Sequence, residues 1–239
     1  MLVALVLSDG VSADECEAFA AVFASVAECR LVCVAADVGR VPGAGGGWIA
    51  DTRFDEVTSP DIVLVPGGLG CARSAASEPL LDWLRAVVPR AQWLVASSTG
   101  TVVVAAAGLL DHHEAATHWL AGPLLESYGS PASTDRVVEV GRVITCSGLV
   151  TSMHVALIVV MRVFGPAAVE RARAAVADHC EARRRPPQPG PRRGRRRARR
   201  RRAAATTSPP FVGGPLPINR ELVAPDHIEF DEPTITRLR

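Results

Sequence analysis

The sequence contains no lysine, so all 26 of its basic residues are arginine. This bias leaves the charge balance unchanged and says little about partners. Also missing is any run of about 18 consecutive apolar residues, which a membrane-spanning helix would need. The N-terminus reaches Asp9 early and lacks the basic flank of a signal peptide. We therefore expect a cytoplasmic protein without a membrane partner.

Cysteine pairs of the C-x-x-C type are absent, although the chain has six cysteines. The scattered positions of these cysteines argue against both a zinc site and a disulfide framework. We therefore expect reduced thiols and no bound metal. The six residues are Cys16, Cys29, Cys33, Cys71, Cys146 and Cys180.

Charge is distributed unevenly along the 239 residues. Residues 1–182 carry a formal charge of −9, residues 183–202 carry +12 from twelve arginines, and residues 203–239 carry −2. An arginine run can neutralise phosphates without sequence preference, but no aromatic residue lies within this one for base stacking. The run therefore favours no more than weak, non-specific contact with nucleic acid.

Composition also suggests the domain boundaries. The arginine-rich stretch has too few apolar groups to offset the entropy lost on ordering. We expect a folded domain over residues 1–178, a disordered Arg/Pro-rich linker over 179–210, and a loosely ordered tail over 211–239.

Apolar runs and helical patterns alternate along the first 177 residues, which predicts an α/β fold. Runs that are apolar throughout are typical of strands in a mostly parallel sheet sandwiched by helices. The expected strands cover 2–7, 29–36, 62–65, 93–96 and 143–145. The first expected helix follows the strand over 2–7 and ends near residue 27. The others cover 78–88, 101–110 and 151–177, the last with a break at Gly165-Pro166.

The sharpest local feature is the passage from a buried strand into a buried helix through Ser97-Ser98-Thr99-Gly100. Such a junction presents one side chain, here Ser98, above the edge of the sheet. The alternative interpretation is an N-cap serine, since serine is favoured where helices begin. Gly67-Gly68 follows the preceding strand, and its amides could bind an oxyanion at the same edge.

Four motifs, in this order and spacing, resemble the ThiJ/PfpI superfamily. They are DIVLVPGGLG (61–70), the junction at 97–100, AAAGLLDHHEAATHW (105–119) and VITCSGLVTSMHVAL (143–157). The resemblance covers about residues 1–177 and implies a flavodoxin-like, class I glutamine amidotransferase-like fold. The third motif is similar to the branch with isonitrile hydratases and the sensor lobes of AraC-type regulators. It further implies a homodimer that takes a small-molecule ligand or substrate and needs no cofactor.

The resemblance also implies the site residues. Ser98 occupies the position of the family's cysteine, and Thr99 keeps the residue that follows it. Glu15 matches the carboxylate that touches the thiol in the family. We expect Ser98 to have a positive φ angle, Glu15 to lie beside it with a raised pKa, and the amides of Gly68 and Ser98 to serve as oxyanion donors beside Gly67.

The chain departs from the family pattern at several places. Phe19 stands where a proline is usual, Ser152 where a glycine is usual, and His154 where an aspartate is usual. His118 matches the branch motif, and it either acts in the site or holds the loop. His112 and His113 are expected on the surface. Cys71 and Cys146 are either rival thiols near the site or buried apolar groups.

Two functions remain open. The first is an isonitrile hydratase-like enzyme in which Ser98 lies at the nucleophile position, Glu15 is the acid/base and Thr99 orients the site. The second is a non-catalytic metabolite-binding lobe related to AraC-type regulators. We do not expect a complete regulator, because a DNA-binding domain needs about 100 residues and only residues 183–239 follow the body.

Overall fold

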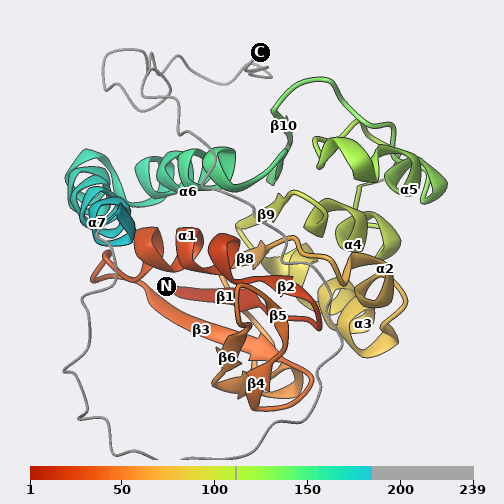
Figure 1. The fold of residues 1–239 in the computed structure, drawn as a ribbon, viewed down its shortest axis with the longest axis horizontal. Coiled ribbons are helices and arrows are strands. Elements are labelled where there is room, and N and C mark those ends of the chain that lie inside the picture. Colours follow the sequence, from red (N-terminus) through yellow and green to blue (C-terminus); the bar gives the residue numbers. More distant parts are fainter. Residues whose placement is uncertain (111, 185–239) are drawn as a thin grey trace, which may run out of the picture. The chain divides into compact units, whose positions relative to one another are not determined.

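The computed structural model of the protein describes residues 1–110 and 112–184 (Figure 1). The linker expected over 179–210 lies mostly outside the described residues, and the tail expected over 211–239 lies wholly outside them. Helix α7 continues to Arg184.

A seven-stranded sheet forms the centre of the fold, in the order β10-β11-β9-β8-β1-β3-β7. Neighbouring strands pair in parallel, except that β10 runs antiparallel to β11. The predicted mostly parallel sheet is therefore confirmed. Its strands are β1 (Leu2–Val6), β3 (Arg30–Ala35), β7 (Thr52–Arg53), β8 (Ile62–Val65), β9 (Trp93–Ser97), β10 (Val137–Val140) and β11 (Val143–Cys146).

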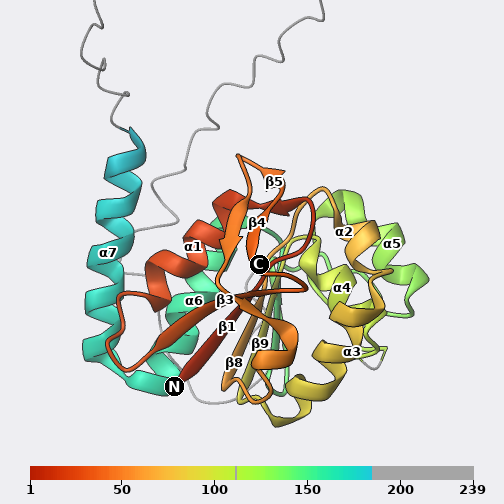
Figure 2. The ribbon, with the colours of Figure 1, turned by 90° about the horizontal axis from the view of Figure 1, so that it is seen from below.

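Helices cover both faces of this sheet, as Figures 1 and 2 show. One face carries α1 (Ala13–Phe23), α6 (Leu149–Phe164) and α7 (Pro166–Arg184), which pack against one another. The other face carries α2 (Cys71–Ser74), α3 (Glu78–Val87), α4 (Gly100–Ala106) and α5 (Gly122–Ser127). The predicted break at Gly165 separates α6 from α7, because Gly165 has a φ of 79° and a proline begins the next helix.

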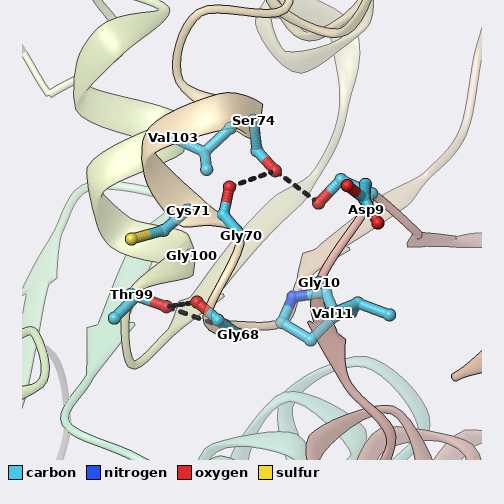
Figure 3. A pocket seen from close by; sticks show the side chains of 13 residues that line it. Asp9, Gly10, Val11, Gly68, Gly70, Cys71, Ser74, Thr99, Gly100 and Val103 are labelled. Carbon is cyan, nitrogen blue, oxygen red and sulfur yellow. Dashed lines mark hydrogen bonds between the residues drawn. The ribbon is translucent and has the colours of Figure 1, made fainter. Parts of the chain in front are cut away.

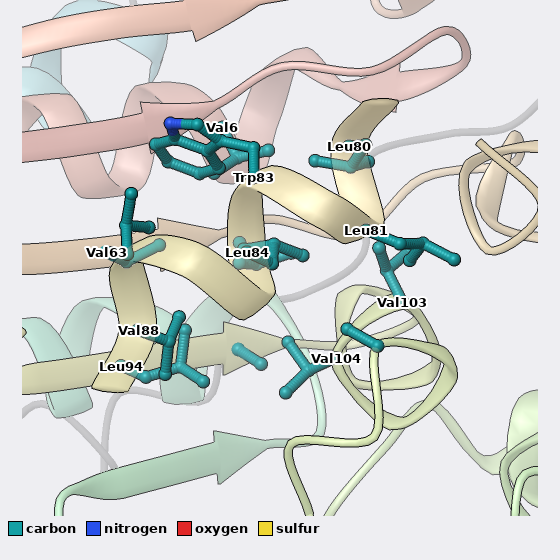
Figure 4. Close-up of a cluster of buried hydrophobic side chains, with 14 of the residues drawn as sticks. Val6, Val63, Leu80, Leu81, Trp83, Leu84, Val88, Leu94, Val103 and Val104 are labelled. Carbon is teal, nitrogen blue, oxygen red and sulfur yellow. The ribbon is translucent and has the colours of Figure 1, made fainter. Parts of the chain in front are cut away.

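Each face of the sheet has its own hydrophobic cluster. In the cluster of Figure 4, α3 turns its buried side towards β8 and β9. Trp83 stacks on Phe54 with ring centroids 5.1 Å apart, and its indole Nε1 donates to the Val57 carbonyl at 2.7 Å. Full burial of one large apolar side chain such as Leu84 contributes about 2 kcal/mol to the free energy of unfolding.

Shorter elements fill the connections. An antiparallel pair, β4 (Gly39–Val41) and β6 (Trp48–Ala50), encloses β5 (Gly43–Ala44), which pairs with β2 (Val11–Ser12). The apolar runs of the sequence predict no strand between residues 37 and 61. Three 3₁₀ turns complete the list: η1 (Phe54–Glu56), η2 (Val88–Arg90) and η3 (Trp119–Ala121). Within the described residues, no helix is long and apolar enough to span a bilayer.

Candidate functional site

The junction between β9 and α4 holds Ser98 in a left-handed backbone conformation. Its φ angle is 55°, so the expected positive value is confirmed. For a residue with a Cβ this conformation is costly and persists only where the surroundings enforce it. Two hydrogen bonds enforce it here: the Ser98 amide donates to the Cys146 carbonyl at 2.7 Å, and the Thr117 hydroxyl donates to the Ser98 carbonyl at 2.8 Å.

The glycines around this junction are required by close packing. A Cβ on Gly67 would lie 2.8 Å from both the Ser98 Cβ and the Thr99 amide nitrogen. A Cβ on Gly100 would lie 2.3 Å from the Val65 carbonyl oxygen. The ends of β8 and β9 can therefore approach only because these positions have no side chain.

Glu15 reaches the junction from the first turn of α1. Its side chain is only 7 % exposed, and its Oε2 accepts a hydrogen bond from the Gly67 amide at 2.7 Å. The hydroxyls of Ser97 and Ser98 lie close enough to the carboxyl group to lower its pKa. Burial raises the pKa of Glu15, while these contacts and the charge of His118 oppose the rise. The expected proximity to Ser98 and the direction of the pKa shift are confirmed.

The Thr99 side chain is hydrogen-bonded to the glycine turn that follows β8. Its hydroxyl accepts a hydrogen bond from the Gly68 amide at 2.8 Å and donates one to the Gly68 carbonyl at 2.8 Å, as Figure 3 shows. This reciprocal pair fixes the loop after β8 against the loop after β9.

The amides expected as oxyanion donors have hydrogen-bond partners within the protein in this conformation. The amides of Gly68 and Ser98 already donate to the Thr99 hydroxyl and the Cys146 carbonyl, and the Gly67 amide donates to Glu15. The amide of Thr99 makes no hydrogen bond within the described part of the chain, and the residue after the exposed side chain supplies the oxyanion donor in comparable junctions. Sequence alone could not assign these partners, because they lie on distant strands.

A small pocket lies beside the junction, with a volume of about 170 Å³ that includes open solvent. Figure 3 shows its lining, which comes from the ends of β1 and β8, from α2 and from the start of α4. Thr99 and Gly67 line it, whereas Ser98 does not and is 6 % exposed. The Cys71 thiol lines the pocket, and an ion pair of 2.8 Å between Arg73 and Asp9 lies nearby.

The remaining residues singled out in the sequence have structural surroundings of their own. The Nδ1 of His118 accepts the Leu120 amide at 3.3 Å, which caps η3, and its charge also reaches Glu15. His112 and His113 are exposed, as predicted. Phe19 and Cys146 are fully buried. Burial raises the pKa of Cys146 to about 11 and lowers the pKa of His154.

Sequence reasoning missed Ser97 as a contact of Glu15. Ser97 is fully buried, and its hydroxyl lies 2.5 Å from that of Ser152, which is also fully buried. The available signal was the serine at 152 in place of the usual small glycine. That signal did not identify a partner, because the two residues are 55 positions apart.

Comparison with known proteins gives a consistent result. The DJ-1/PfpI family model matches residues 1–162. An isonitrile hydratase from Pseudomonas putida is 33 % identical over 114 residues, which are 48 % of this chain and 50 % of the hydratase. The HTH-type transcriptional regulator CdhR from Pseudomonas aeruginosa is 32 % identical over 136 residues, which are 56 % of this chain and 40 % of the regulator. The chain thus matches half or less of the length of these two relatives.

Solved structures share the fold. A ThiJ/PfpI family protein from Pseudomonas syringae superposes with a TM-score of 0.67 at 21 % identity, over 78 % of this chain and 76 % of that one. DJ-1 from Schizosaccharomyces pombe superposes with a TM-score of 0.62 at 20 % identity, over 74 % of this chain and 98 % of that one.

Proposed function

This chain belongs to the DJ-1/PfpI family, and from that premise we propose that it is a small-molecule enzyme of the isonitrile hydratase type. One observation carries the proposal: the buried Glu15 carboxyl, whose pKa is raised, meets the hydroxyl of Ser98 at a backbone conformation that strains the chain. Perturbed acids and strained residues gather at functional sites more often than elsewhere.

The chemistry needs an acid and an oxygen nucleophile at one carbon. When an isonitrile is hydrated, its terminal carbon gains a proton and the oxygen of water, and its nitrogen gains the second proton, which yields a formamide. A carboxyl group that stays protonated to higher pH can supply the first proton. Glu15 has that role in our proposal, and Ser98 is the hydroxyl at the reacting position. Thr99 fixes the loops through Gly68 and offers its own free amide to developing negative charge.

The test is a turnover assay on the purified full chain with isonitriles and with reactive aldehydes. We expect formamide release that falls at least about 100-fold in Glu15→Gln and in Ser98→Ala, because both remove a group that acts on the reacting atoms. Ser98→Cys should retain turnover, since a thiol is the stronger nucleophile. Cys71→Ala is the matched control: this thiol lines the pocket, and its loss should leave the rate within a few-fold. Undiminished turnover in Ser98→Ala contradicts the role of Ser98.

A second function is favoured by a different observation. The amides of Gly67, Gly68 and Ser98 are all engaged within the protein, which suits a rigid site that holds a ligand without reacting with it. In this proposal the chain is a metabolite-binding lobe like part of the regulator relative. Ligand-dependent stabilisation without any product would support it over the enzyme.

We also propose a homodimer in the cytoplasm, as the family resemblance implies. Light scattering coupled to size-exclusion chromatography measures the mass directly, and a mass of one chain at all concentrations contradicts the dimer. The proposed weak contact between the arginine run and nucleic acid is tested by the salt dependence of binding to a duplex of random sequence.

A further inference from the structure

Two buried hydroxyls, Ser97 and Ser152, lie between Glu15 and the start of α6: Ser97 interacts with the Glu15 carboxyl, and Ser152 contacts Ser97. Ser152 is the first member of the buried stripe of α6, which continues through Val155, Ala156 and Val159. A hydroxyl in a stripe that is otherwise apolar needs a partner, because an unsatisfied polar group is costly to bury. The Ser152 hydroxyl has two oxygen partners, the Ser97 hydroxyl at 2.5 Å and the Gly148 carbonyl at 2.9 Å.

Counting hydrogens gives this chain of groups two allowed directions. Each serine hydroxyl has one hydrogen to donate and lone pairs to accept. If Ser152 donates to the Gly148 carbonyl, then Ser97 must donate to Ser152, and Ser97 can only accept from a protonated Glu15. If Ser152 donates to Ser97 instead, then Ser97 can donate to an ionised Glu15.

The second direction leaves no carbonyl without a partner. The Gly148 carbonyl also accepts the Ser152 amide at 2.8 Å and the Thr151 hydroxyl at 2.7 Å. It therefore stays satisfied when the Ser152 hydroxyl turns away from it. Both protonation states of Glu15 thus find a complete set of hydrogen bonds without movement of the backbone.

We propose that Ser97 and Ser152 form a reversible hydroxyl pair that reorients with the protonation of Glu15 and so positions this carboxyl group as both acid and base. The two serines are positioning residues, because they act through Glu15. Their role in turnover rests on the function proposed above, whereas the reorientation itself does not.

Three other titratable groups interact with Glu15, and each lies on a different element of the fold. His118 approaches from the loop before η3, Cys16 lies on α1 itself, and Cys146 lies at the end of β11. Burial raises the pKa of both thiols, so they remain protonated while Glu15 titrates. The Cys146 thiol donates a weak hydrogen bond to the Ser152 oxygen, with the sulfur and oxygen 3.9 Å apart.

The experiment is a pH titration of the Glu15 carboxyl carbon by NMR in the full chain labelled with ¹³C-glutamate. The signal is assigned by its disappearance in Glu15→Gln. In Ser152→Ala, the neutral state leaves the hydrogen of Ser97 without its acceptor, so the pKa of Glu15 should fall by about one pH unit, a tenfold change in the protonation equilibrium. In Ser97→Ala, the ionised state loses a donor to a charge, so the pKa should rise by a similar amount.

Opposite signs in the two variants are the result that supports the reversible pair. A fall in both variants, or a rise in both, means that the hydroxyls point in one fixed direction and overturns the proposal. No change in Ser152→Ala overturns it as well. Ser130→Ala is the control: Ser130 is equally buried and donates to the His113 carbonyl at 2.6 Å, so its loss should leave the Glu15 titration unchanged. This titration needs no substrate, so it decides the question even if no isonitrile is hydrated.

Discussion

Ser98 combines two costs at one position, a left-handed backbone and a buried hydroxyl. Glycine adopts this backbone without a steric penalty, so the strain can be measured by comparing substitutions that both remove the hydroxyl. The Ser98→Gly variant should exceed Ser98→Ala in free energy of unfolding by about 1 kcal/mol. Urea denaturation at one pH measures this difference.

Ser97 provides the matched comparison for that experiment. It is also buried, but it lies in β9, and its φ is not positive. Glycine is less favourable than alanine within a strand by about 0.5 to 1 kcal/mol, so the order of the two variants should reverse at Ser97. The same order at both positions would contradict strain at Ser98.

Glu15 makes stability depend on pH in a defined sense. Burial raises its pKa in the folded chain above the ordinary value of 4.5. Its contribution is therefore fully present below about pH 4.5 and is lost as the pH rises through the folded pKa. Glutamine has no proton to lose, so its stability does not change as Glu15 would ionise. As the pH rises from the unfolded pKa to the folded pKa of Glu15, the free energy of unfolding of Glu15→Gln should therefore increase relative to that of the parent, by about 1.4 kcal/mol for each pH unit between the two pKa values. Free energies of unfolding of both proteins over a pH series measure the gain, and parallel curves contradict it.

At the scale of elements, the loops at the carboxyl edge of the sheet depend on glycines that admit close contact. Gly100 begins α4, and a Cβ there would lie 2.3 Å from a backbone oxygen that cannot move freely. Gly100→Ala should therefore lower the free energy of unfolding by about 2 to 3 kcal/mol.

Gly122 is the control, because it begins α5 in the same way. The atom nearest to a Cβ on Gly122 is the Ala132 Cβ at 3.4 Å, an ordinary contact. Gly122→Ala should change stability by less than about 0.5 kcal/mol. Equal effects at the two glycines, measured by urea denaturation, would show that close packing at the junction is not the cause.

Local patterns predicted the long elements and missed the short ones. Strand β8 matches its predicted range because Ile62 to Val65 is apolar throughout, with a turn signal after it. Strand β10 is only four residues long and lacks an alternating pattern, so only its pairing with β11 distinguishes it from a loop. Helix α4 ends at Ala106, short of the predicted 110, because Gly108 adopts a φ of 74°.

The site was predictable where a local sequence pattern marks it, as the passage through Ser97-Ser98-Thr99-Gly100 from a buried strand into a buried helix marks Ser98. It was not predictable where two distant residues meet, as Ser97 and Ser152 do, because no local signal encodes that contact.

At the scale of the whole molecule, the two hydrophobic clusters lie within the first 177 residues. The twelve arginines of residues 183–202 repel one another and offer no apolar surface. A chain ending at Arg184, where α7 ends, should melt within a few degrees of the full chain. Circular dichroism melting curves of both chains measure this. Loss of cooperative unfolding in the shorter chain would place part of the stability beyond Arg184.

The site joins segments that are far apart along the chain, and this has a consequence for how it forms. Glu15 meets Gly67 across 52 positions, and Ser97 meets Ser152 across 55. These contacts join residues far apart in sequence, so the site is complete only when the strands and helices that carry them have come together. A ligand of this site therefore binds finished molecules and no partly folded ones. By mass action such a ligand acts as a chemical chaperone, which stabilises the folded state of a destabilised variant by an amount that grows with the logarithm of the ratio of its concentration to the dissociation constant.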